Sequence, residues 1–114
     1  MPSVCPGVDF ENVAREWRCK YAPENDKKAL QEAQKIFETY ISTLKGLNGF
    51  VSLQRVVCGG CFDFKVITTL KAGDDYFGAW EKADFSVEQE FLEKLKAIEG
   101  ISLVETQTYT LTLM

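Results

Sequence analysis

Two cysteines spaced as Cys58-Gly59-Gly60-Cys61 form the sharpest chemical motif in the sequence. Two thiols three positions apart can interconvert between dithiol and disulfide, or supply two of the four ligands of a zinc site. In typical redox motifs of this kind a helix N-terminus stabilises the first thiolate, whereas a strand-like segment follows Cys61 here. Zinc would need two further ligands, and only Cys5 and Cys19 remain. Redox or metal chemistry is one alternative, and the other is that two small residues flank a tight turn.

A second group of candidate residues is polar and lies near the same turn. Asp63 and Lys65 follow it, and Gln54 precedes it. A carboxylate that is buried among such groups has a shifted pKa and can act as a base or bind an amine. The alternative is a solvated surface with ordinary charge pairs. The predicted ligand-binding residues are Gln54, Gly59, Gly60, Asp63 and Lys65, with Glu16, Arg18 and Lys20 as further members of the polar group.

Histidine is absent from the 114 residues. Serine–histidine and cysteine–histidine relays, histidine-ligated metals and histidine-bound haem are therefore excluded, and no cofactor or metal is expected. The net charge of −4 is spread along the chain without a basic run, which argues against nucleic acid as a partner. No segment has the pattern of a secretory signal or a membrane span, so we expect a cytoplasmic protein with free thiols.

The elements that position these residues begin with a strand. Residues 1–11 predict an irregular lead-in to a single domain at 12–114. Polar and apolar residues then alternate, which indicates a half-buried strand. One side of this strand carries Val13, Trp17, Cys19 and Tyr21, and the other carries Ala14, Glu16, Arg18 and Lys20.

Apolar residues at spacings of three and four predict two helices, one up to Leu44 and one over residues 87–98. Gly46 and Gly100 are expected to end them. The predicted N-caps are Asn25 or Asp26 for the first helix and a capping box of Ser86 with Gln89 for the second.

A hairpin lies between the helices. Residues 50–58 and 61–70 have strand composition, and Gly59-Gly60 suits a two-residue turn because glycine adopts positive φ without steric cost. This turn would pair Cys58 with Cys61 on one face of the hairpin. A last strand is predicted over residues 101–114, with either its threonines or the set containing Tyr109 on that same face.

This order of elements, β, α, β, β, α, β, predicts an α+β fold of the ferredoxin-like type. Its four-stranded antiparallel sheet has both helices on one face. The other face has no helix to cover it. It is either solvated or covered by the sheet of a second copy in a homodimer.

An aromatic segment, Tyr76-Phe77-Gly78-Ala79-Trp80, connects the hairpin to the second helix. With Trp17 it could line a pocket at the sheet edge. The alternative is that these aromatic residues are core, and for Trp17 we expect core.

The segment Gly60-Cys61-Phe62-Asp63-Phe64-Lys65-Val66 resembles the Gly-x-Tyr-Asp-Tyr-x-x-(Lys)-Val stretch in effector-binding domains of leucine- and asparagine-responsive regulators. Residues 91–101, followed by Val104-Glu105-Thr106, are similar to the closing helix and strand of those domains. The resemblance covers the last 65 or so residues, without the DNA-binding part of the regulators, and the first helix is longer here.

These domains belong to the dimeric α+β barrel superfamily, which also contains stress-responsive proteins, cofactor-free monooxygenases and haem-degrading enzymes. The resemblance implies a homodimer with its sheets face to face, and a ligand near Gly59, Gly60 and Asp63. The absence of histidine counts against the haem branch and against many monooxygenases.

Three functions follow as hypotheses. The first is a module that binds or senses a small molecule through Asp63 and the Gly59-Gly60 backbone. The second is a cofactor-independent enzyme, like a monooxygenase or an isomerase, that uses a carboxylate such as Asp63 or Glu16 inside the barrel. The third is a thiol redox or zinc site at Cys58 and Cys61.

Overall fold

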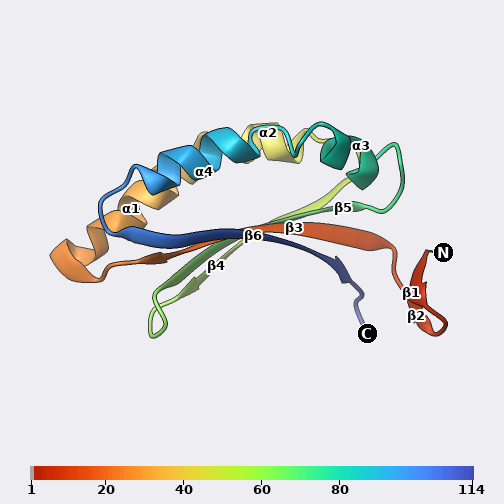
Figure 1. Cartoon of the computed structure of the whole chain (residues 1–114), viewed down its shortest axis with the longest axis horizontal. Helices are drawn as coiled ribbons and strands as arrows, with labels where there is room; N and C mark the ends of the chain where they lie inside the picture. The colour runs from red at the N-terminus through yellow and green to blue at the C-terminus, as the bar shows by residue number, and fades with distance from the viewer. Residues whose placement is uncertain (1) are drawn as a thin grey trace.

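The computed structural model describes residues 2–114, and its main feature is one antiparallel sheet with four helices on a single face (Figure 1). The sheet order is β4-β5-β3-β6, which confirms the ferredoxin-like α+β fold. The strands are β3 (Asn12–Tyr21), β4 (Phe50–Cys58), β5 (Asp63–Lys71) and β6 (Ile101–Leu111). The helices are α1 (Glu24–Glu38), α2 (Ile41–Lys45), α3 (Phe77–Lys82) and α4 (Glu88–Lys96).

The central strand β3 follows the predicted alternation. Trp17, Cys19 and Tyr21 are buried in the core beneath the helices. Glu16 and Arg18 lie on the other face, where they contact side chains of β6. The period of two along a strand therefore assigned the faces of β3 correctly.

The helices differ from the predicted pattern at their ends. The first predicted helix is divided into α1 and α2, with the break after Glu38. Asn25 and Asp26 have positive φ angles of 55° and 58°, so neither caps the helix as predicted. The capping box is also wrong, because Val87 is the N-cap of α4 with a φ of 69°, and the Gln89 amide donates to Glu93 instead.

The turn of the β4–β5 hairpin is longer than predicted. Cys58 pairs with Asp63 and Val57 with Phe64, so residues 59–62 form a four-residue loop. The residue with positive φ in this loop is Phe62, at 60°, not Gly59 or Gly60. The predicted pairing was therefore wrong by two residues. A shift of two preserves the alternation, so the side chains of residues 52–58 still lie on their predicted faces. A further register shift between Phe50 and Ser52 pairs Phe50 with Leu70, which breaks the predicted alternation at the start of β4.

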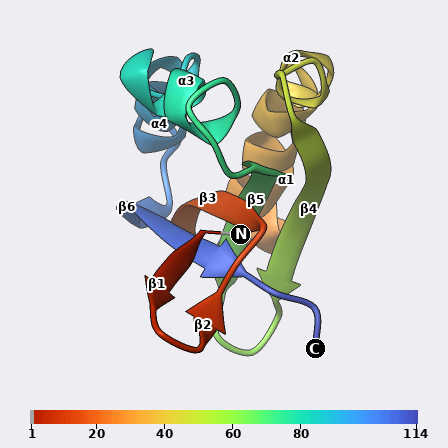
Figure 2. The same cartoon turned by 90° about the vertical axis from the view of Figure 1, so that its right-hand side faces the viewer.

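Residues near the N-terminus form a small hairpin where an irregular lead-in was predicted. β1 (Ser3–Cys5) pairs with β2 (Val8–Asp9), and Gly7 supplies the positive φ of 86° in the turn. This hairpin lies near the C-terminal end of the chain (Figure 2), where the Thr112 hydroxyl donates to the Asp9 carbonyl.

We call the sheet face opposite the helices the open face. It carries the side chains of Ala14, Glu16, Arg18 and Lys20 from β3 and those paired beside them on β5 and β6. The β4–β5 loop and the end of β6 both extend away from the helices, so they border this face (Figure 1). Within residues 2–114, no helix is long and apolar enough to cross a membrane.

Candidate functional site

Glu16 is a buried carboxylate on the open face. It lies at the middle of β3, flanked by Ile67 of β5 and Gln107 of β6, and only 5% of the residue is exposed. Burial of an ionisable side chain is costly unless polar partners compensate for lost water. A buried carboxylate on an otherwise uncovered sheet face is therefore the first candidate for a functional group.

Two donors hold the Glu16 carboxylate. The Tyr109 hydroxyl donates to Oε1 at 3.0 Å, and the Arg18 guanidinium donates to Oε2 at 2.9 Å. Arg18 also donates to the Gln107 side chain at 2.8 Å and lies 3.6 Å from Glu105. A carboxylate has about four lone-pair positions, so each Glu16 oxygen keeps room for one more donor.

The electrostatic environment keeps both partners in their donating forms. Burial, followed by the hydrogen bond to Glu16, raises the pKa of Tyr109 to about 12. The hydrogen bond to Glu16 also raises the pKa of Arg18. At neutral pH the phenol therefore stays protonated and the guanidinium stays charged, so both continue to stabilise the carboxylate.

A buried hydroxyl lies in the next row of the same face. Thr69 pairs with Ala14, two positions from Glu16 along β3, and only 2% of Thr69 is exposed. Its Oγ1 has no hydrogen-bond partner among residues 2–114. An unpaired buried hydroxyl is costly and can be satisfied by a ligand or water.

A small cavity lies at the hairpin end of the open face. Its volume is about 150 Å³, and Lys20, Asp63 and Lys65 contribute to its lining together with Arg18 and residues of β6. Lys20 forms an ion pair with Asp63 at 2.6 Å. The hydrogen bond from Lys20 holds the pKa of Asp63 below its usual range. Asp63 is therefore a weaker base than an unpaired aspartate, and the cavity suits recognition of a charged or polar group.

Of the predicted ligand-binding residues, this cavity brings together Asp63 and Lys65. Gln54 lies on β4, separated from Glu16 by Ile67. Gly59 and Gly60 lie at the tip of the loop, where an added Cβ would meet open space. The predicted residues thus fall into three separate places, and Glu16 lies between the cavity and Thr69 along the sheet.

A second polar cluster, on the helix face, was missed by the sequence analysis. The Arg15 guanidinium forms two hydrogen bonds, of 2.8 and 3.0 Å, with the Glu88 carboxylate of α4. The Trp17 indole donates to the same carboxylate at 2.6 Å, and Arg15 lies 4.0 Å above the centre of the Phe85 ring. Arg15 also donates to Thr106 and Thr108. The sequence did contain a signal for this cluster. Arg15 is a charged residue at a position of β3 that the alternation assigns to the helix face, so it needed a partner there.

These contacts give the Arg15–Glu88 cluster a structural role. The carboxylate already accepts three donors, and the cluster links β3, β6 and the start of α4. It fixes α4 on the sheet, whereas the Glu16 carboxylate keeps free acceptor positions.

The aromatic segment forms α3, and most of its rings belong to the core. Phe77 and Trp80 are buried, and Trp80 contacts Trp17 at 6.3 Å between ring centres. A cavity of about 220 Å³ lies beside Tyr76 and Trp80. This volume is below the 300 to 1,000 Å³ of usual ligand sites.

A more open groove of about 520 Å³ lies between α1 and β4, lined by Leu30, Val57 and polar residues of α1.

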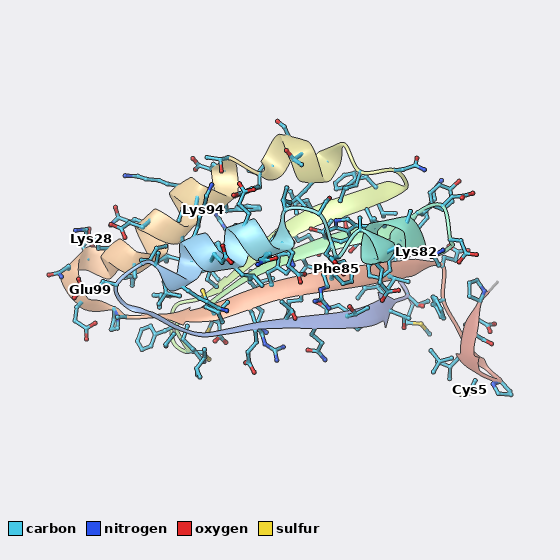
Figure 3. The ribbon with its side chains drawn as sticks, turned by 45° about the horizontal axis from the view of Figure 1, so that its top comes forward. Cys5, Lys28, Lys82, Phe85, Lys94 and Glu99 are labelled. Carbon is cyan, nitrogen blue, oxygen red and sulfur yellow. The ribbon has the colours of Figure 1, made fainter. Side chains whose placement is uncertain are left out.

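The four cysteines are free thiols. Cys58 and Cys61 lie together at the hairpin loop, whereas Cys19 is buried, and its burial raises the pKa of that thiol to about 11. Cys5 lies on the N-terminal hairpin at the other end of the molecule (Figure 3). Within residues 2–114, no group of three or more histidine, cysteine or acidic residues is placed to hold a metal ion.

Comparisons with known proteins find similarity in structure alone. No protein-family model matches the chain, and no curated protein sequence matches it. Among solved structures, SnoaB from Streptomyces nogalater, described as a cofactor-independent oxygenase, is similar with a TM-score of 0.61 at 16% identity. The match covers 91% of this chain and 96% of SnoaB.

Two further solved structures are similar over comparable lengths. One is a Caulobacter crescentus CB15 protein with the proposed activity of an antibiotic biosynthesis monooxygenase. It has a TM-score of 0.64 at 10% identity, over 91% of this chain and 92% of that protein. The other is Rv0793 from Mycobacterium tuberculosis, with a TM-score of 0.60 at 10% identity, over 90% of this chain and 97% of that protein. These likenesses show that the chain shares the ferredoxin-like α+β fold of these proteins.

Proposed function

We propose that the protein is a cofactor-independent, oxygenase-like enzyme that acts on a small organic molecule, with Glu16 as its general base. The observation that carries the proposal is the Glu16 carboxylate, which is buried on the open face and held by Tyr109 and Arg18. The similarity to SnoaB supports the reaction class, because that protein is described as a cofactor-independent oxygenase.

The chemistry of such a reaction defines what the side chains have to do. Without a cofactor the substrate itself must reduce O₂, and a carbon acid does so once a base has removed its proton. The carbanion and O₂ combine to a peroxide anion, which regains the proton as a hydroperoxide. Loss of water then converts the original CH₂ group into a ketone. The protein therefore has to supply a base, donors for the developing oxyanion and a site that excludes water.

The cluster has groups for the first two of these tasks, the base and the donors. Glu16 takes the proton through a free lone pair on either oxygen. Tyr109 and Arg18, already donating to Glu16, steady its charge before the transfer and can donate to an enolate oxygen after it. The Thr69 hydroxyl, unpaired within residues 2–114, is a further donor in the same face.

The open face has to be covered for this chemistry, and we propose that a second copy of the chain covers it. The face combines half-buried or exposed apolar residues such as Ile67 and Val56 with the polar cluster. Two such faces in a homodimer would enclose Glu16 between the sheets. Light scattering should give a dimer mass. Ile67→Lys should give a monomer, whereas Ser42→Lys on the exposed surface of α2 should leave the dimer intact.

The test of the reaction is oxygen consumption with anthrone as the probe, because its CH₂ carbon is acidified by two rings and a carbonyl. We expect the protein to accelerate conversion to anthraquinone with one O₂ consumed per product. Glu16→Gln should lower the rate about 100-fold or more, as for loss of a general base. Glu99→Gln, an exposed change beyond α4, is the matched control. An unchanged rate in Glu16→Gln would remove Glu16 from the mechanism.

A module that binds or senses a small molecule is the second candidate, as the resemblance to the effector-binding domains implies. The cavity at Lys20, Asp63 and Lys65 favours it, because it lies beside the hairpin loop. The two candidates are distinguished by comparing Asp63→Asn with Glu16→Gln. Loss of ligand binding in Asp63→Asn, with no turnover by the wild-type protein, would support sensing.

A further inference from the structure

The loop between β4 and β5 is held by its neighbours on β3. The Tyr21 hydroxyl donates to the Cys58 carbonyl at 2.9 Å, and the Tyr21 backbone N–H donates to the Phe62 carbonyl at 3.0 Å. The Lys20 ammonium donates to the Cys61 carbonyl at 3.0 Å. These three bonds fix both ends of the loop, so Cys61 has a defined position relative to Cys58 at the end of β4.

The sulfur of Cys58, the last residue of β4, accepts a backbone hydrogen bond from this loop. The Cys61 N–H donates to Cys58 Sγ at 3.0 Å. At a helix N-terminus, free N–H groups stabilise a thiolate in the same way. The absence of a helix after Cys61 was the argument against thiol chemistry in the sequence. Here the loop backbone supplies one such donor, the Cys61 N–H.

The surroundings make the two thiols unequal. The Cys61 thiol, together with the N–H groups of Cys61 and Gly60, holds the pKa of Cys58 below that of a free thiol. The same contact raises the pKa of Cys61. Two nearby charges have smaller effects: Asp63 raises the pKa of both thiols, and Lys20 lowers the pKa of Cys61. The pKa of Cys58 still lies below that of a free thiol, and the pKa of Cys61 above it. Cys58 is therefore the better nucleophile, and Cys61 is the neighbour able to complete a disulfide.

We propose that Cys58 and Cys61 form a redox-active dithiol that reacts with low-molecular-weight disulfides, a second activity independent of Glu16. The Cys58 thiolate attacks one sulfur of the disulfide R–S–S–R, which forms the Cys58–S–S–R bond and releases R–S⁻. Cys61, as its thiolate after loss of a proton to solvent, then attacks the Cys58 sulfur and releases the second R–S⁻. The protein loses two electrons and two protons, and R–S–S–R becomes two R–SH.

Exposure and geometry permit both steps. Cys61 is exposed and Cys58 is partly exposed, and an added Cβ at Gly59 or Gly60 would meet open space. A small disulfide can therefore reach Cys58 without displacing the core. The Cys61 backbone N–H already lies 3.0 Å from the Cys58 sulfur, so the two residues are close in space before they react.

The experiment exposes the reduced full chain to glutathione disulfide, followed by acid quenching, alkylation and peptide mass mapping. We expect the wild-type protein to form the Cys58–Cys61 disulfide. Cys61→Ser should accumulate glutathione on Cys58, because the second step is lost. In Cys58→Ser, the remaining Cys61 should react with glutathione disulfide more slowly than Cys58 does in Cys61→Ser. Circular dichroism of each variant checks that the fold is retained.

A second measurement uses the wild-type protein alone. The rate of iodoacetamide alkylation is followed at Cys58 and at the exposed Cys5 as a function of pH. Cys58 should react faster at pH 7, with a midpoint below the value of about 8.5 for an unperturbed thiol. Equal rates and midpoints at Cys58 and Cys5, or glutathione found first on Cys61, would overturn the proposal.

Discussion

The Tyr109 hydroxyl donates to the Glu16 carboxylate at 3.0 Å across 93 positions of sequence. The two residues lie on neighbouring strands, β6 and β3, with their side chains on the open face. This contact joins the end of the chain to its first long strand. It also places the only phenol of β6 against the buried carboxylate on which the proposed activity rests.

The energy of this contact can be measured with a double-mutant cycle. Tyr109→Phe and Glu16→Gln should each lower the free energy of unfolding, and the double variant should lose less than the sum. We expect a coupling free energy of about 1 to 2 kcal/mol, typical of a hydrogen bond to a charged group. Urea unfolding of the wild type, the two single variants and the double variant gives this coupling free energy. A coupling indistinguishable from zero would contradict the hydrogen bond.

Asp63 should make the protein less stable in acid. The hydrogen bond from Lys20 lowers the pKa of Asp63 in the folded protein. A carboxyl with a lowered folded pKa stabilises the protein above its unfolded pKa, about 3.9, and loses this contribution as pH falls through the folded pKa. The melting temperature should therefore decrease below about pH 4, and less steeply in Asp63→Asn. Lys20→Met should return the NMR titration midpoint of Asp63 towards its ordinary value.

Removing Glu88 should destabilise the fold more than removing another acidic residue of α4. Glu88→Ala leaves the mostly buried Arg15 charge and the Trp17 indole without their acceptor. We expect a loss of about 2 kcal/mol in the free energy of unfolding. Breaking a fully buried ion pair would cost more, but Arg15 and Glu88 both keep some exposure to solvent. Glu93→Ala, on the exposed side of α4, should change it by about 0.5 kcal/mol or less. Equal effects would show that the cluster does not anchor α4.

Glycine is required at Gly49 and not at Gly60. An added Cβ at Gly49, where φ is 81°, would lie 2.6 Å from Cδ1 of Tyr76, whereas at Gly60 it would meet open space. Gly49→Ala should therefore destabilise the protein by about 1 kcal/mol or more, from strain and crowding combined. Gly60→Ala should be neutral within about 0.5 kcal/mol. Thermal unfolding compares the stability of the two variants. A large loss of stability in Gly60→Ala would favour the two-residue Gly59-Gly60 turn that the sequence predicted.

The sequence alone determined the order of the main elements and the face on which most strand side chains lie. Both depend on local periodicity, because a strand alternates every two residues and a helix repeats every 3.6. Trp17 was thus assigned to the core, and Glu16 and Arg18 to the opposite face, before any pairing was known. An error of two residues in the hairpin left these faces unchanged.

The tertiary structure alone decided the contacts between these elements. Tyr109 meets Glu16, and Glu88 meets Arg15, because of the register of β6 on β3 and the position of α4, which distant packing sets. The backbone N–H donor to the Cys58 sulfur likewise depends on the four-residue loop, whose conformation Tyr21 and Lys20 hold from another strand. Hydrogen bonds of this kind need positions accurate to a fraction of an ångström, and local propensity does not specify positions between separate segments.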